Sequence, residues 1–211
     1  EGQSFAIISK QDGSITQEIQ IPFEEIKTIY ITLRDEANDM TYGAAPYIYP
    51  IIPVSNNNWI LVEPSSDTIY SYSSEYEMKP FLTRVPSIQS MNPEVFLFPS
   101  VVTDRYCFME IVKKEYSFST GKGFPSTFLM YDRQEKSIFR YTVNNADYSY
   151  KNIVNMVLSP ESSEVAFYHK IEPSGLVDSY KKGELKGKLK EIASKLDPED
   201  NPVIMLIKHK K

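Results

Sequence analysis

The chain has 211 residues and a formal net charge of −5, and it carries 15 tyrosines, 11 phenylalanines and 14 prolines against only 8 glycines. This acidic balance argues against a general nucleic-acid-binding protein. No apolar run approaches the roughly 18 residues that a membrane-spanning helix needs, so we expect no transmembrane segment. Cys107 is the single cysteine, so we expect neither an intrachain disulfide nor a cysteine metal cluster.

A ten-residue spacing recurs along the chain and predicts one hairpin used three times. In the segments FAIISKQDGSI, WILVEPSSDTI and FLMYDRQEKSI, which begin at Phe5, Trp59 and Phe128, an aromatic residue stands ten positions before an isoleucine. In each segment an apolar strand enters a polar turn and returns through a Ser or Thr just ahead of the isoleucine. Alternation with period two along both arms fixes which face of each hairpin packs.

Two stretches extend this hairpin into units of four strands, rich in aromatic and β-branched residues. The clearer unit has its predicted strands at residues 95–102, 105–113, 127–132 and 137–143. The other has its predicted strands at residues 47–54, 59–63, 68–73 and 78–85. Partial units are predicted at residues 5–21, 29–33, 153–158 and 165–171.

The apolar pattern changes to a helical period near the C-terminus. Between residues 183 and 196, one helix face is formed by Leu185, Leu189, Ile192, Ala193 and Leu196. The Asp197-Pro198 step ends this pattern, and residues 203–208 return as a last strand. We therefore expect one C-terminal α-helix inserted before the last strand, which caps the array of sheets and delivers that strand to an edge.

Repeated four-stranded antiparallel units predict an all-β protein, a β-propeller-like array of about three and a half blades. A β-sandwich is the alternative, although a sandwich does not require the repeated hairpin spacing. Because propellers usually have about four to eight blades, we expect residues 1–211 to be a single propeller-type domain, the C-terminal part of a larger propeller. An open blade edge invites association, so a homodimer through such an edge is a second way to complete the ring.

The C-terminal segments also resemble a known family. The segments PEVFLFPSVVTDRYCFMEIVKKEY, GFPSTFLMYDRQEKSIFRYTV and KGELKGKLKEIASKLDPEDNPVIMLIKHKK resemble the closing part of the six-bladed β-propeller family of unknown function. The resemblance covers most of residues 47–211. It implies a cell-envelope or extracellular location, periplasmic or at the surface, because family members are abundant as predicted lipoproteins and secreted proteins of Gram-negative gut-type bacteria. The family has no established catalytic motif, so the resemblance assigns no functional residue.

Few side chains suggest catalysis or metal binding, and we predict no catalytic residue, no metal site and no cofactor. His169 and His209 are far apart in sequence and neither has a companion at metal-ligand spacing, so a structural role is the simpler interpretation. Cys107 lies in a strong predicted strand without a basic neighbour that would lower the pKa of its thiol. We expect it to be buried and inert.

The aromatic and proline-rich run TYGAAPYIYPIIP is the ligand-binding candidate. Tyr42, Tyr47 and Tyr49 are amphipathic rings on a backbone stiffened by two prolines, and such rings can stack on a sugar or pack on a peptide at low entropic cost. The alternative is that Tyr47 and Tyr49 share one strand face and pack between blades.

Six lysines near the predicted helix suggest a second surface. They could face an anionic lipid or glycan, but a solvated helix face is the simpler interpretation. They are Lys181, Lys182, Lys186, Lys188, Lys190 and Lys195.

These patterns favour a non-enzymatic binding or scaffold protein, with an unidentified peptide, glycan or partner protein as its ligand, and the resemblance implies the bacterial cell envelope as its location. The alternative is a glycoside hydrolase or lyase with carboxylates converging at the propeller channel. Asp39, Asp104 and Glu161 could meet there, although solvated loop acids are the simpler interpretation of each.

Overall fold

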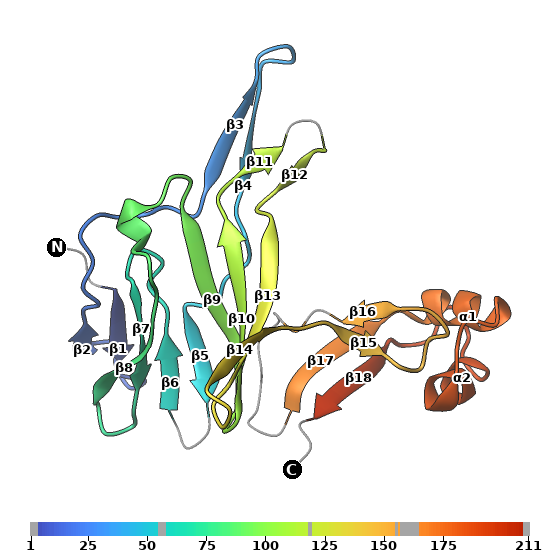
Figure 1. Cartoon of the computed structure of the whole chain (residues 1–211). Coiled ribbons are helices and arrows are strands. Elements are labelled where there is room, and N and C mark those ends of the chain that lie inside the picture. The colour runs from blue at the N-terminus through green and yellow to red at the C-terminus, as the bar shows by residue number, and fades with distance from the viewer. Residues whose placement is uncertain (1–3, 55–57, 118–119, 155, 157–164, 209–211) are drawn as a thin grey trace. The chain divides into compact units, whose positions relative to one another are not determined.

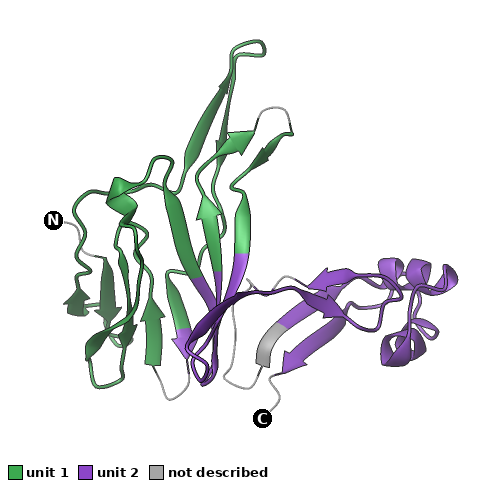
Figure 2. Cartoon of the chain, viewed as in Figure 1, with its two compact units in different colours: residues 1–52, 56–98, 110–127 green, residues 53–55, 99–109, 128–211 purple. Residues whose placement is uncertain are grey.

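The computed structural model describes residues 4–54, 58–117, 120–154, 156 and 165–208 (Figure 1). Most elements in these ranges are strands in antiparallel pairs, with two short α-helices near the C-terminus, which confirms the prediction of an all-β fold. Contacts divide the chain into two compact units, coloured in Figure 2. Unit 1 comprises residues 1–52, 56–98 and 110–127, and unit 2 comprises residues 53–55, 99–109 and 128–211.

The second predicted four-stranded unit is present as a continuous sheet. Its strands are adjacent in chain order, as Figure 1 shows, and they are β5 (Ile51–Val54), β6 (Asn58–Leu61), β7 (Thr68–Tyr72) and β8 (Met78–Thr83). A short 3-10 helix, η1 (Ile88–Ser90), follows β8. The predicted strand at residues 47–54 is shorter than expected, because Pro46 and Pro50 hold the tyrosine-containing segment outside the hydrogen-bonded sheet.

The unit predicted at residues 94–143 is the other four-stranded sheet. It has the order β14-β13-β10-β9, and its strands are β9 (Val95–Val102), β10 (Tyr106–Lys113), β13 (Ser126–Asp132) and β14 (Ser137–Arg140). A small hairpin, β11 (Tyr116–Ser117) and β12 (Lys122–Gly123), is inserted between β10 and β13. The prediction of four successive strands in one antiparallel sheet unit is therefore confirmed.

All three copies of the ten-residue motif form antiparallel hairpins, as predicted. The first copy is β1 (Phe5–Ile8) with β2 (Ile15–Ile19), and the others are β6 with β7 and β13 with β14. The aromatic residue and the isoleucine of each copy thus stand on opposite arms of one hairpin.

The polar turn of each copy is closed by the same side-chain-to-backbone hydrogen bond. Ser9, Glu63 and Asp132 occupy equivalent positions, four residues after the start of each copy. Each side chain accepts a hydrogen bond from the backbone N–H two residues further on, at 3.2, 3.1 and 2.9 Å respectively. Short polar side chains that bond their own backbone in this way favour turns, which explains why the repeat keeps a Ser or an acid there.

The remaining described strands form separate two-stranded ribbons. They are β3 (Ile31–Asp35) with β4 (Met40–Ala44), β15 (Val143–Asn145) with β16 (Asn152–Val154), and β17 (Val165–Ile171) with β18 (Val203–Lys208). The described residues thus contain two four-stranded sheets, a smaller number than the three and a half blades expected. The strand predicted at residues 137–143 ends at Arg140, and residues 141–142 are not in a strand. The chain then enters the two-stranded ribbon of β15 and β16.

The prediction of one C-terminal helix is wrong in number. Two helices, α1 (Pro173–Lys181) and α2 (Gly187–Ala193), separate β17 from β18. Pro173 suits the first turn of α1, where its missing N–H costs no hydrogen bond. Gly183 has a φ of +72°, a conformation that glycine adopts readily, and it lies in the connection where α1 has ended and α2 has not begun.

Part of the predicted apolar helix face belongs to the connection between the two helices. Leu185 lies there in an isolated bridge with Tyr148. It is buried together with Leu176, Leu189 and Ala193, so the apolar pattern correctly marked side chains that pack together. The last strand begins and ends where the sequence predicted it.

Each unit has its own buried apolar clusters. In unit 1, Leu61 and Tyr72 pack with Ile19 and Ile21, which joins the first repeat copy to the second. In unit 2, one cluster surrounds Phe108, and the other is the helical cluster around Leu176. Burial of this apolar surface is the main stabilising contribution to such a fold.

Candidate functional site

We consider an open groove in unit 1 as the candidate site. It has a volume of about 340 Å³ and lies between the segment after β2 and the turn that leads into β7. We call it the β7 groove, and its lining residues are Pro22, Phe23, Glu24, Ser65, Ser66, Asp67, Thr68, Tyr70 and Gln89. The turn that forms one wall is the polar turn of the second repeat copy.

Hydrogen bonds within the turn fix this wall. The backbone N–H of Ser66 donates to the Glu63 carbonyl at 3.0 Å, and the N–H of Ser65 donates to the Glu63 carboxylate at 3.1 Å. The hydroxyl of Ser66 then accepts the N–H of Thr68 at 3.2 Å, where β7 begins. Ser65 and Ser66 are both buried, so the wall is set before any ligand arrives.

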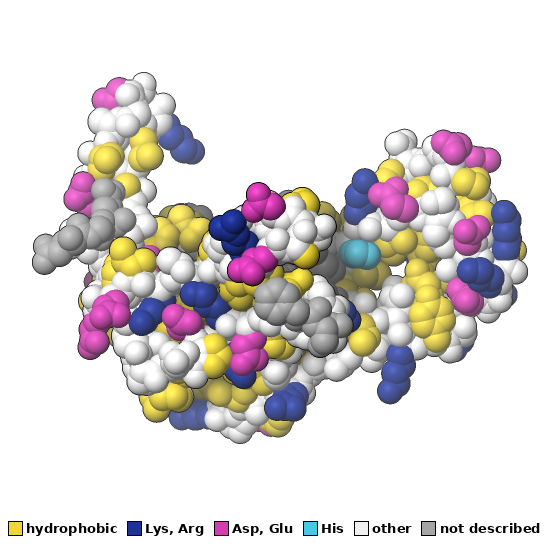
Figure 3. Space-filling model, turned by 90° about the horizontal axis from the view of Figure 1, so that it is seen from above, with side chains coloured by type: hydrophobic (Ala, Val, Ile, Leu, Met, Phe, Trp, Pro, Cys, Tyr) yellow, Lys and Arg dark blue, Asp and Glu magenta, His cyan; other side chains and the backbone are white. Residues whose placement is uncertain are grey.

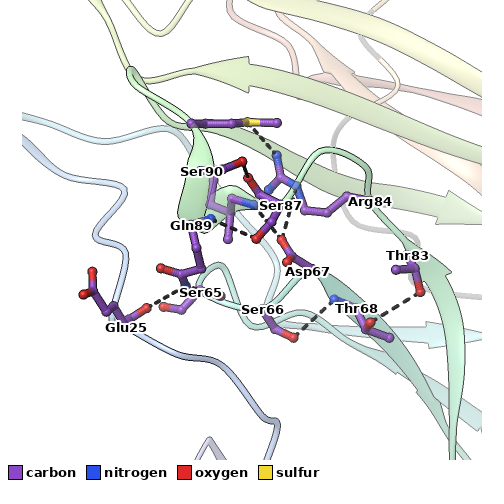
Figure 4. A network of polar contacts seen from close by, with 12 residues as sticks. Glu25, Ser65, Ser66, Asp67, Thr68, Thr83, Arg84, Ser87, Gln89 and Ser90 are labelled. Atoms are coloured by element: carbon purple, nitrogen blue, oxygen red, sulfur yellow. Dashed lines mark hydrogen bonds and ion pairs between the residues drawn. The ribbon is translucent and has the colours of Figure 1, made fainter.

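Gln89 joins three segments that are distant in sequence, as Figure 4 shows. Its Nε2 donates to the backbone carbonyls of Glu25 at 3.0 Å and of Ser65 at 3.1 Å. The hydroxyl of Ser65 accepts the backbone N–H of Lys27 at 2.9 Å, a further tie between the two walls. Because both amide hydrogens of Gln89 are used, its orientation is defined, and its buried Oε1 has no hydrogen-bond partner within the described structure.

Asp67 and Arg84 determine the charge beneath the groove. Oδ1 of Asp67 accepts the N–H of Ile88 at 2.6 Å and lies 3.9 Å from Nε of Arg84 (Figure 4). The Arg84 side chain is only 10% exposed, and burial lowers the pKa of its guanidinium while Asp67 opposes that shift. Arginine nevertheless stays protonated in proteins, so this cation offsets the charge of Asp67.

The groove has acidic but no basic lining residues. Glu24 and Asp67 are its charged residues, and Arg84 lies behind Asp67 instead of in the lining. The wider surface differs, because on the face drawn in Figure 3 acidic and basic side chains are interspersed. The local charge of the β7 groove therefore disfavours anionic ligands.

The predicted tyrosine site is partly assembled. The rings of Tyr47 and Tyr49 meet edge to face at a centroid distance of 5.1 Å, and Tyr47 is 70% exposed. Both precede β5 in an irregular segment, and so they do not share a strand face as the alternative interpretation supposed. Tyr42 lies on β4, where its hydroxyl is 3.3 Å from the sulfur of Met40. Their role as ligand-binding residues stays a prediction.

The sequence did not identify the β7 groove as a site. Ser65, Ser66 and Asp67 were recognised only as turn residues, and Phe23 and Gln89 lie in segments without a predicted element. The available signal was the Pro-Ser-Ser-Asp turn, which is longer and richer in hydroxyls than a tight hairpin needs. Its contact with Gln89 depends on a sequence separation of 24 residues, which no local pattern reveals.

The other candidate side chains have simpler roles. Cys107 is fully buried, as expected, and burial raises the pKa of its thiol to about 12, which disfavours the reactive thiolate. His169 is exposed on β17. The six lysines around α1 and α2 are all exposed, as expected of a solvated helix surface.

The acids considered for hydrolysis lie in different units or outside the described residues. Asp39 lies in the β3–β4 turn, in an ion pair with Arg34 at 3.2 Å, and Asp104 is exposed in the β9–β10 turn of unit 2. Glu161 and His209 lie outside the described residues. Within the described ranges, no three His, Cys, Asp or Glu side chains are grouped to hold a metal ion. No described helix has the length and hydrophobicity needed to cross a bilayer.

The structure is thus that of an all-β protein with an open groove in unit 1. No protein-family model matches the sequence, and neither does any curated protein. A crystal structure of a protein from Bacteroides fragilis, provisionally named an exported protein, aligns with a TM-score of 0.48 and 14% sequence identity. That alignment covers 99% of this chain and 77% of the other chain.

Proposed function

We propose that this chain is a non-enzymatic binding protein of the bacterial cell envelope and that the β7 groove holds its ligand. The observation that carries the proposal is the preorganised wall of the groove. Gln89, Ser65 and Asp67 bind three separate backbone segments together, so the concavity does not depend on a ligand to form. Preorganisation of this kind lowers the ordering cost of binding.

We also propose that the sheets belong to a β-propeller of the six-bladed family that the C-terminal segments resemble. Two four-stranded antiparallel sheets with adjacent strand order support this proposal, as do three hairpins that share one turn device. The loops of a propeller are common positions for binding sites, and the β7 groove is built on such a turn. The envelope location is proposed from the sequence resemblance.

Binding to arrays of peptides and of neutral, amino and anionic glycans tests the proposed function. The full chain should retain at least one ligand class, and the Glu24→Arg variant should lose that signal because a long cation then occupies the rim of the groove. Glu18→Arg is the matched control, since the Glu18 side chain on β2 is exposed and does not line the groove. The proposal would be overturned if wild type retained nothing or if both variants bound like wild type.

A further inference from the structure

The wall of the β7 groove offers both hydrogen-bond donors and hydrogen-bond acceptors. The hydroxyl oxygens of Ser65 and Ser66 each accept a backbone N–H, which leaves their own protons to donate. Acceptors are supplied by the carboxylates of Glu24 and Asp67. A ligand that donates and accepts through the same groups, as a sugar hydroxyl does, matches such a wall.

Two aromatic side chains complete the lining. Phe23 and Tyr70 are both half-buried, Phe23 on the segment after β2 and Tyr70 on β7. The C–H faces of a pyranose ring are apolar and pack on aromatic rings, while its hydroxyls stay available at the edge. A ligand with one apolar and one polar aspect therefore suits this combination of side chains.

Charge selects between classes of sugar. The lining contains no lysine or arginine, and it contains two carboxylates, so a sulfated, phosphorylated or uronic sugar would be repelled. Arg84, 3.9 Å from Asp67, offsets one of these negative charges, so the groove has little excess charge for a cationic ligand. An uncharged ligand fits this balance best.

The volume sets the size of the ligand. About 340 Å³ lies at the lower end of the range of roughly 300–1,000 Å³ that small-molecule sites occupy. The groove is open to solvent, so a chain of sugars could continue beyond it. One or two sugar rings would be held within it.

We propose that the β7 groove binds an uncharged sugar unit, with the ring on Phe23 and Tyr70 and its hydroxyls on the serine and carboxylate groups of the wall. This inference deepens the proposed function and depends on it. It names the ligand class of a site that the sequence did not reveal.

The test is an NMR titration of the full chain with neutral sugars, namely glucose, galactose, mannose, N-acetylglucosamine and their disaccharides. Glucuronic acid and glucosamine serve as charged counterparts. We expect amide shifts centred on residues 65–70 that saturate in the millimolar range with a neutral sugar. Phe23→Ala should weaken this affinity about tenfold, and Glu24→Gln about threefold. Phe139→Ala removes an exposed aromatic side chain of β14 and should leave the affinity unchanged.

The outcomes separate this inference from the proposed function. If Phe23→Ala unfolds, the Glu24→Gln variant and the amide shifts still decide the result. Sugar titrations without shifts at residues 65–70, or a preference for glucuronic acid or glucosamine, would overturn the sugar assignment. If the arrays meanwhile show a peptide whose binding requires Glu24, the binding function stands and only the ligand class is wrong. If the arrays show no ligand either, both proposals fail.

Discussion

Asp132 shows how one buried carboxylate can hold a turn and a neighbouring strand together. Its side chain is 4% exposed, and its Oδ2 accepts hydrogen bonds from Nε and Nη2 of Arg105 at 2.9 and 2.7 Å. Its Oδ1 accepts the N–H groups of Gln134 and Glu135, which close the hairpin turn. Hydrogen bonds between a guanidinium and a carboxylate are stronger than those between neutral groups.

This arrangement predicts an acid-dependent loss of stability. The hydrogen bonds from Arg105, above all, hold the pKa of Asp132 below its ordinary value, and the backbone N–H groups add to this effect. A carboxylate with a lowered folded-state pKa stabilises the fold above its unfolded pKa of about 3.9, and this contribution disappears as the pH falls through the folded value. Asp132→Asn should lower the melting temperature at neutral pH and make the further loss between about pH 5 and pH 3 smaller than in wild type.

Calorimetry across this pH range measures both effects. Asp104→Asn is the control, because Asp104 is exposed in the β9–β10 turn and its replacement should leave the wild-type pH profile intact. An Asp132→Asn profile as steep as that of wild type would show that Asp132 does not cause the acid sensitivity.

At the scale of elements, the two short helices depend on one fully buried leucine. Leu176 of α1 has no exposed surface and packs with Leu185, Leu189 and Ala193. Leu176→Ala should reduce the free energy of unfolding by about 2–5 kcal/mol, because the truncated side chain leaves a cavity. Tyr180→Ala, on the same helix at 38% exposure, should cost less than about 1 kcal/mol. Denaturant unfolding gives both values, and equal losses in the two variants would contradict this packing.

The hairpins could be predicted from sequence because their determinants are local. A ten-residue spacing, alternating apolar residues and a side chain at Ser9, Glu63 or Asp132 that closes the turn all lie within one short segment. The break after β14 could not be predicted, because Val143 pairs with Val154 instead of extending the previous strand. The helix count failed for a similar reason, since Leu185 has helical spacing but packs from a connecting segment.

Proline marks the edges of the two larger sheets. Pro53 lies in β5, Pro80 in β8 and Pro99 in β9, and each of these strands is at the edge of its sheet. The central strands β6, β7, β10 and β13 contain no proline. Because proline lacks the N–H that a ladder needs, it hinders the pairing of another strand at these edges. The predicted homodimer would then have to use an edge without proline, such as β14.

At the scale of the whole molecule, the acidic residues are concentrated in the half that contains the β7 groove. Residues 1–100 carry a net charge of −8 and residues 101–211 a net charge of +3. The negative net charge of residues 1–100 and the acidic lining of the groove both disfavour anionic ligands. Both are consistent with the assignment of an uncharged sugar.

The candidate site was less predictable than the fold. Tyr42, Tyr47 and Tyr49 stand out in the sequence because aromatic residues and prolines are adjacent there. The groove is instead assembled from Phe23, the turn at residues 65–68 and Gln89, which tertiary hydrogen bonds bring together. Composition can indicate a segment suited to ligand contact. The meeting of serines and a glutamine from distant segments can be seen only in the folded chain.

Hydrogen exchange of the full chain, with and without its best-bound array ligand, tests the central claim most directly. The account predicts slower exchange in peptides that cover residues 22–27, 65–70 and 85–91, since these segments form or brace the β7 groove. Protection confined to residues 42–49, or to the lysine-bearing helices α1 and α2, would contradict it and place the ligand elsewhere on the protein.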